Sequence, residues 1–206
     1  MTRAERELAR LLGDVRRCRV CRDAPRGRRL PHEPRPVLRP SATARLCICS
    51  QAPGVRVHAS GIPFSDPSGD RLRGWLGLTR DEFYDTTRIA IVPMGFCFPG
   101  NAADGGDLPP RRECAPLWQE RVFAAMPRLE LILLVGGHAQ RWHLREAGGT
   151  TTETVGRWRE LLRATQIPRR VVLPHPSWRN NRWLADNPWF TRDMLPDLRR
   201  EVRCLL

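Results

Sequence analysis

The sequence predicts an α/β fold in which helices cover both faces of a parallel β-sheet. Four short apolar runs end in turn residues, as buried strands do, and segments with helical periodicity lie between these runs. Strands that alternate with helices are typical of a parallel sheet packed between helical layers. The chain has 206 residues, of which 41% are hydrophobic, so it is long enough to bury a core. We expect one domain over residues 1–206, without internal repeats.

The expected elements follow in chain order. A charged, helix-periodic segment covers residues 1–18, and an irregular arm rich in arginine and proline covers 22–43. The expected strands cover 44–50, 88–95, 129–137 and 169–177. The expected helices cover 69–77, 111–126, 138–147, 151–166 and 191–203. A Thr-x-x-Glu-like pattern at the start of the fourth of these helices is typical of an N-terminal cap.

The chain carries a net charge of +13 at pH 7, and all 35 of its basic residues are arginine. A basic surface favours polyanions, of which the phosphate backbone of nucleic acid is the obvious one. The absence of lysine also fits a compositional bias toward arginine, so charge alone supports nucleic-acid binding only modestly. The absence of lysine does exclude one chemistry, because no lysine side chain is present to form a Schiff base.

The sequence contains no membrane or secretory pattern. No run of 18 apolar residues is present, and the charged N-terminal segment lacks the apolar core of a signal peptide. We therefore expect a cytoplasmic protein without a membrane partner, in which the seven cysteines stay reduced.

Four of the cysteines form a candidate metal site. Cys18 and Cys21 form a C-x2-C pair within residues 1–43, and Cys97 and Cys114 lie on a segment rich in proline and glycine. Four soft ligands from two distant segments are typical of zinc or of an iron–sulfur cluster. The alternative is a chance C-x2-C pair with unrelated buried thiols, and the spacing by itself does not decide between the two.

Three unusual loops follow strands of the expected sheet. "SQAPG" follows the first strand, "PMGFCFPG" ends the second and "HPSWRNNRW" follows the fourth. In open α/β sheets, ligands bind beyond the carboxyl ends of the strands. We therefore expect these three loops to converge on one site.

Several side chains in these loops suit chemistry on a planar ligand. His175 lies between two prolines, which restrict its backbone, and it can donate to negative charge that develops on a leaving group. Phe64 can stack on a base, although an isolated phenylalanine more often belongs to the core. Asp66 and Asp70 can orient water or stabilise a cation, or they can cap the helix that follows.

The segment after His175 combines arginines, asparagines and tryptophans. Arginine interleaved with aromatic rings suits a phosphate backbone and unstacked bases. The alternative is a set of solvated arginines over a tryptophan-rich core. The candidate DNA-binding residues are Trp178, Arg179, Asn180 and Arg182.

Together these motifs resemble the uracil-DNA glycosylase superfamily, and they are closest to its iron–sulfur branch, family four. That branch carries G-E-x-P-G, then G-x-P-F, then a small residue and a glycine that open a helix. The stretch "SQAPGVRVHASGIPFSDPSGDRL" matches this spacing without a gap. The family's H-P-S motif stands at His175, Pro176 and Ser177, and the resemblance spans about residues 15 to 195.

The resemblance implies a three-layer α/β/α sandwich with a central four-stranded parallel sheet. It implies a monofunctional DNA-repair glycosylase, expected to be a monomer, that hydrolyses the N-glycosidic bond of uracil or a related deaminated base flipped out of DNA. It also makes a [4Fe–4S] cluster on the four cysteines a better assignment than zinc. In such an enzyme His175 would bond the base carbonyl and Phe64 would stack on the base. Further substrate contacts would come from Ala52, Pro53, Gly54 and Ser177.

Three departures from the family pattern concern the chemistry. Gln51 stands at the catalytic position where family four has a glutamate, and Ala52 stands where another branch has an aspartate. Pro93 replaces the asparagine that reads the base, and proline has no side-chain donor or acceptor. The first motif thereby leans toward family five, whose aspartate follows the phenylalanine. We therefore predict Asp66 as the catalytic carboxylate and Asp70 as the second candidate.

The alternative function is a protein of the same superfamily that binds damaged or single-stranded DNA without catalysis. The loss of the acidic residue at Gln51 favours this alternative, whereas Phe64, Asp66 and His175 in register favour the enzyme. The sequence leaves open which base is removed and which kind of strand is preferred.

Overall fold

A computed structural model describes residues 1–103, 105–144 and 149–206 and contains a four-stranded sheet. The strands are β1 (Leu46–Cys49), β2 (Ile89–Ile91), β3 (Leu131–Val135) and β4 (Arg169–Leu173). Their order in the sheet is β2-β1-β3-β4, and every neighbouring pair is parallel. The expected α/β fold around a central four-stranded parallel sheet is therefore confirmed.

Each strand is shorter than the apolar run that predicted it. Every residue of β1, β2 and β3 is buried, as expected for strands covered on both faces. The amide of Val92, just after β2, still donates to the carbonyl of Ile48 at 3.0 Å. Beyond such points the chain leaves the sheet and forms the loops at the carboxyl ends of the strands.

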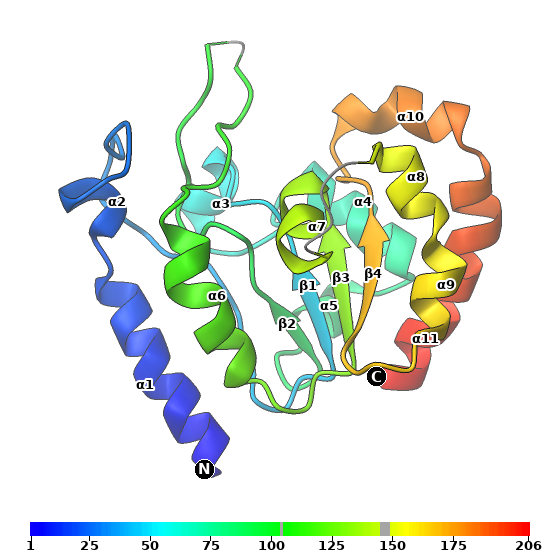
Figure 1. Ribbon diagram of the computed structural model, residues 1–206, viewed down its shortest axis with the longest axis horizontal. Helices are drawn as coiled ribbons and strands as arrows, with labels where there is room; N and C mark the ends of the chain where they lie inside the picture. Colours follow the sequence, from blue (N-terminus) through cyan, green and yellow to red (C-terminus); the bar gives the residue numbers. More distant parts are fainter. Residues whose placement is uncertain (104, 145–148) are drawn as a thin grey trace.

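Helices cover both faces of the sheet, with α6 and α7 in front of it in Figure 1 and α4 and α5 behind it. The longer helices are α1 (Arg3–Arg17), α4 (Pro67–Leu76), α6 (Cys114–Ala124), α7 (Gly137–Leu144) and α11 (Leu195–Leu205). The shorter helices are α2 (Val20–Asp23), α3 (Val55–Ser60), α5 (Arg80–Tyr84), α8 (Thr151–Gly156), α9 (Trp158–Arg163) and α10 (Asn181–Asp186). A 3-10 turn, η1 (Trp178–Asn180), and a π-helical turn, η2 (Phe190–Met194), complete the described elements. None of the described helices is long and apolar enough to cross a membrane.

Several helices differ from their predicted extents. The segment 151–166 forms two helices, α8 and α9, that meet at Arg157. The last helix, α11, begins after the π-helical turn because Pro196 lies in its first turn, where a missing backbone N–H is tolerated. The predicted helix 138–147 is observed as α7, and its last three residues lie outside the described residues. Helices α3, α5 and α10 are too short to give a periodic sequence pattern, so they were not predicted.

Capping boxes begin three of the helices. In each, a threonine hydroxyl accepts from a glutamate amide three residues later, and that glutamate accepts from the threonine amide. The pairs are Thr2 with Glu5 at α1, Thr79 with Glu82 at α5, and Thr150 with Glu153 at α8. The cap predicted at the fourth expected helix is therefore confirmed.

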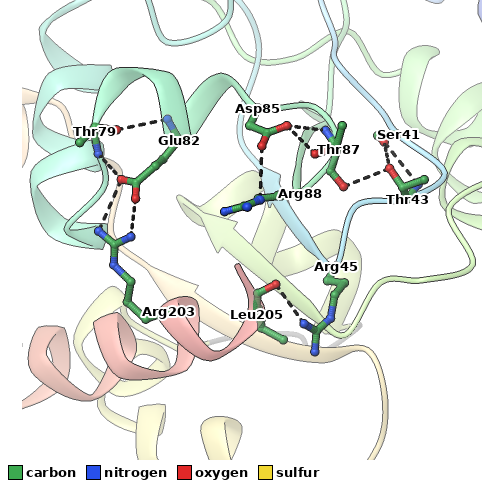
Figure 2. Close-up of polar contacts among 10 residues, drawn as sticks. All are labelled: Ser41, Thr43, Arg45, Thr79, Glu82, Asp85, Thr87, Arg88, Arg203 and Leu205. Carbon is green, nitrogen blue, oxygen red and sulfur yellow. Dashed lines mark hydrogen bonds and ion pairs between the residues drawn. The ribbon is translucent and has the colours of Figure 1, made fainter.

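A polar network at the amino ends of the strands anchors the last helix (Figure 2). Glu82 of α5 forms an ion pair with Arg203 of α11. Arg45, which precedes β1, donates to the backbone carbonyl of Leu205 at 3.2 Å. These contacts lie at the opposite end of the strands from the predicted site, so they stabilise the fold without entering that site.

Candidate active site

The three loops predicted to converge meet at the carboxyl ends of the sheet, and the loop after β3 lies among them. The amide of Gly95, after β2, donates to the carbonyl of Gln51, after β1, at 3.0 Å. Gly136, after β3, lies against His175, after β4, so closely that a Cβ atom on Gly136 would be 3.4 Å from the imidazole Cδ2. Gly136 has a φ of +83°, a conformation that side chains other than glycine rarely adopt. The first two loops are therefore joined through their backbones, and the last two pack closely at Gly136 and His175.

His175 is held as a hydrogen-bond donor. Its Nδ1 accepts from the amide of Ser177 at 3.2 Å, so in the neutral ring the proton resides on Nε2. The Asn180 side chain donates to the His175 carbonyl at 2.7 Å and fixes the backbone. Burial lowers the pKa of His175, although the negative charge of Asp66 opposes this effect. The ring is therefore neutral at pH 7.

Asp66 and Asp70 differ in their surroundings. Asp66 begins α4, and its Oδ1 accepts from the amide of Gly69 at 3.0 Å. The negative charge of Asp66 also raises the pKa of His175, against the larger effect of burial. Asp70 has a side chain that is 76% exposed and forms an ion pair with Arg73. Of the two predicted carboxylates, Asp66 is the one whose charge affects the pKa of His175.

A carboxylate that sequence reasoning missed, Asp107, also reaches the site. A Cβ atom on Gly54 of the "SQAPG" loop would lie 3.0 Å from Asp107 Oδ2. Burial and the negative charge of Asp66 raise the pKa of Asp107, while Arg179 acts in the opposite direction. Asp107 lies in a Gly-rich stretch between two cysteines and matches no motif, so only its spatial neighbours reveal it.

A hairpin formed by residues 100–103 and 105–108 carries Asp107 to this position. The amide of Leu108 donates to the carbonyl of Gly100 at 2.9 Å, and Asn101 forms an isolated antiparallel bridge with Asp107. On the other side of the hairpin, a Cβ atom on Gly106 would lie 2.8 Å from the guanidinium of Arg179. The hairpin therefore contacts both the loop after β1 and the loop after β4.

Phe64 has a strained backbone and a buried ring. It is only 8% exposed, and its ring packs edge-on against Phe83 with centroids 6.0 Å apart. Its φ of +57° is uncommon outside glycine and is typical of functional positions. A Cβ atom on Gly69 would lie 1.8 Å from the Phe64 carbonyl oxygen, so α4 begins directly against this residue. Stacking of Phe64 on a base stays a prediction.

The remaining residues of the first two loops supply mostly backbone. Gln51 makes no side-chain hydrogen bond within the described part of the chain, and Pro53 is buried. Ala52 lies 3.5 Å from the position of a Cβ atom on Gly95. The carbonyl of Pro93 accepts from the Gln119 side chain at 2.7 Å. Pro93, after β2, therefore has no side-chain group that could form a hydrogen bond with a base.

The predicted DNA-binding residues have different neighbours. Trp178 is 72% exposed, and the guanidinium of Arg179 lies 5.8 Å from the centre of its ring. Arg182 pairs with Asp186 at 3.0 Å on the surface of α10. Asn180 donates to the His175 carbonyl, so it positions the histidine, a role that the sequence did not reveal. An exposed tryptophan beside arginine is the feature of this segment best suited to contact bases.

The four predicted metal-binding cysteines line one cavity. Cys18 caps the end of α1 and Cys21 lies in α2, whereas Cys97 lies in the loop before α6 and Cys114 begins that helix. The amide of Phe96 donates to the Cys114 sulfur at 3.3 Å. Within the described residues, Nε of the cavity-lining Arg111 is buried without a hydrogen-bond partner. An anionic group between the four sulfurs would provide that partner, because thiolates and sulfides accept hydrogen bonds.

The spacing of these thiols bears on the type of metal. Among the described residues, no group of three or more His, Cys, Asp or Glu side chains is close enough to hold a metal ion. Zinc requires four sulfur atoms about 2.3 Å from one centre. A [4Fe–4S] cluster takes one cysteine on each iron, so its ligands stand farther apart around a cavity. The assignment of a [4Fe–4S] cluster or of zinc to these cysteines therefore stays a prediction.

Two comparisons relate the chain to known proteins. The family model "Uracil DNA glycosylase superfamily" matches residues 38–199. Among solved structures, wild-type SMUG2 of Pedobacter heparinus is similar at 13% sequence identity and a TM-score of 0.42, with 77% of this chain and 76% of that chain covered. A likeness this distant carries no argument about the site.

Proposed function

The chain belongs to the uracil DNA glycosylase superfamily, and we propose that it is a monofunctional DNA glycosylase that removes a deaminated base such as uracil. The observation that carries the proposal is that His175 is held as a neutral donor at the carboxyl ends of the strands, where the charge of Asp66 acts on it and Asp107 packs against Gly54 of the first loop. A donor for a departing base and a carboxylate for the sugar are the two groups that hydrolysis of an N-glycosidic bond requires.

His175 stabilises the departing base. As the bond between sugar and base breaks, its electron pair moves onto the base, and Nε2–H of His175 donates to the base oxygen that gains negative charge. The Ser177 amide holds the required tautomer, and Asn180 holds the backbone. Because the ring is neutral, it has this proton to donate without first gaining one from solvent.

The two carboxylates act on the sugar side. Positive charge develops on the sugar ring as the base leaves, and Asp66, fixed by its bond to the Gly69 amide, stabilises that charge. Asp107 faces Gly54, next to the turn that approaches the nucleotide, and takes a proton from the attacking water. The water oxygen bonds to the sugar carbon, and the product is an abasic site.

Two features narrow the reaction class. The chain has no lysine, so it cannot cleave the strand through a lysine imine. Pro93 offers no side-chain hydrogen bond to the base, and we propose that the enzyme accepts several deaminated bases rather than uracil alone.

We propose that Cys18, Cys21, Cys97 and Cys114 hold a [4Fe–4S] cluster. When bound, such a cluster supplies four covalent links and, through its metal charge, keeps buried thiols as thiolates. Its position supports a structural role, because it would join the end of α1 and helix α2 to the loop before α6.

Single-turnover cleavage of labelled oligonucleotides tests the activity. The substrates carry uracil, hypoxanthine, xanthine or 5-hydroxymethyluracil in single and double strands, and alkali converts abasic sites into breaks. We expect product from at least one base, with large losses for His175→Ala and Asp66→Asn. Full activity of Asp66→Asn would remove Asp66 from the mechanism.

The second candidate function is DNA binding without catalysis. It is favoured by Gln51 at the usual position of the acid and by the exposed Trp178. Retained DNA binding with no product from any base or strand would establish this function over the glycosylase.

A further inference from the structure

We propose that an arginine-lined cavity beside the candidate active site binds a backbone phosphate of the DNA strand. The cavity has a volume of about 390 Å³ and lies between the arm after α2 and the loop before α6. Five arginines line it, which are Arg26, Arg28, Arg29, Arg111 and Arg112. Guanidinium groups bind phosphate through paired N–H donors, so this lining matches the chemistry of a phosphodiester.

The cavity has little negative charge of its own. Among the residues that the structure describes, the only acidic one in its lining is Glu113, whose side chain is 3% exposed. One oxygen of Glu113 accepts from the amide of Arg26 at 2.5 Å and lies 3.3 Å from the guanidinium of Arg111. Glu113 is therefore committed to the wall, and the cavity keeps a net positive charge.

Two of the arginines have no role in holding the fold together. Arg28 and Arg112 are exposed, and neither guanidinium forms a hydrogen bond or ion pair within the described ranges. Arg29 has only a distant partner, Asp23, at 3.9 Å. Like charges held this close repel one another, and a bound anion would relieve that repulsion.

The position of the cavity indicates which anion it takes. Gly100, Asn101 and Leu108 line the cavity, and the same hairpin carries Asp107 to the first loop of the site. In Figure 1 this loop projects beyond the carboxyl ends of the strands, the end at which α2 also lies. A strand that delivers a base to His175 therefore passes close to the cavity, and one of its flanking phosphates enters it. The claim that the anion belongs to a DNA strand rests on the proposed function, whereas the match between the arginines and a phosphate group does not.

The test measures DNA binding by fluorescence anisotropy over a series of salt concentrations, with an undamaged single-stranded oligonucleotide as the probe. The variant is Arg28→Gln with Arg112→Gln. The matched control is Arg10→Gln with Arg128→Gln, which removes the same charge from exposed positions on α1 and before β3. All four side chains are exposed, so both variants are expected to fold, and circular dichroism checks this.

We expect the cavity variant to bind every sequence more weakly and to lose about 0.7 units of the slope of log K against log salt, the value for one phosphate contact on a single strand. The control is expected to change the slope much less. Equal slopes for the two variants would overturn the proposal. If inorganic phosphate binds in the cavity but the variant leaves DNA binding unchanged, the assignment of the anion to a DNA strand is overturned. A reduced slope in a protein that cleaves no base would support the cavity while refuting the glycosylase.

Discussion

Close approaches between single residues shape the candidate site. Gly69 is the clearest case, because its position against the Phe64 carbonyl leaves no room for a Cβ atom. The contact holds Phe64 in its left-handed conformation and lets Asp66 cap α4. A glycine at this position is therefore required by geometry, not only by its motif.

We expect Gly69→Ala to destabilise the protein by about 1–3 kcal/mol or more, because the new Cβ atom would overlap the Phe64 carbonyl oxygen. Gly74 lies in the same helix with nothing within 4 Å of its added Cβ atom. Gly74→Ala should instead stabilise by about 0.5–1 kcal/mol, as alanine does in a helix interior. Urea unfolding measures both values, and an equal effect at the two positions would contradict the role of the contact.

Asp107 provides the second prediction at this scale. If it accepts a proton from water, Asp107→Asn should lower the single-turnover rate by about 10²–10⁴-fold while leaving DNA binding intact. The pKa of Asp107 is raised, so the wild-type rate should fall with acidification at a pH above the usual range for aspartate. The variant should lose this acid limb. A rate profile unchanged in Asp107→Asn would exclude Asp107 as the base.

At the scale of elements, the short helix α5 is fixed by tertiary contacts and not by a periodic sequence pattern. Its five residues are too few for a periodic signal, yet its capping box and its ion pair with α11 fix it in place. Hydrogen bonds from Arg203 and from the Thr79 amide lower the pKa of Glu82 to about 2. This carboxylate therefore links stability to pH.

The contribution of the Glu82–Arg203 pair should be fully present above about pH 4.5 and should disappear as the pH falls toward 2, because protonation of Glu82 ends the ion pair. Arg203→Gln should therefore reduce the free energy of unfolding at about pH 6 more than at about pH 3. Arg10→Gln removes a charge from α1 and serves as the control. A loss that does not depend on pH would show that Arg203 acts through packing alone.

At the scale of the whole molecule, the four cysteines that line one cavity come from parts of the chain that the sheet does not join. Helix α2 and the loop before α6 border one cavity, although 75 residues lie between Cys21 and Cys97 in the chain. Few apolar side chains are available in the arm between them, so a covalent link has a structural reason.

Protein purified without oxygen should contain iron and acid-labile sulfide in about equal amounts, about four of each per chain. Cys97→Ser should lose the visible absorption of the cluster and lower the melting temperature, because metal binding contributes to folding. Cys204→Ser changes an exposed cysteine near the end of α11 and should have neither effect. Zinc in place of iron, or intact stability of Cys97→Ser, would contradict the assignment.

The sequence by itself determined the class of fold and the ends of the strands at which the loops meet. Apolar runs and helical periods are local patterns, and parallel strands bring their carboxyl ends to one edge whatever the details of packing. The motif at His175 could be found for the same reason, because its two prolines and its strand are adjacent in the chain.

The tertiary structure alone decided the order β2-β1-β3-β4, the meeting of Asp107 with Gly54, and the use of Asn180 to hold His175. It also decided that five arginines from two segments share one cavity. Each of these facts depends on contacts between residues far apart in the chain or on the direction of a side chain. Such contacts leave no periodic or motif signal in a single sequence, because they are fixed only when the loops pack together.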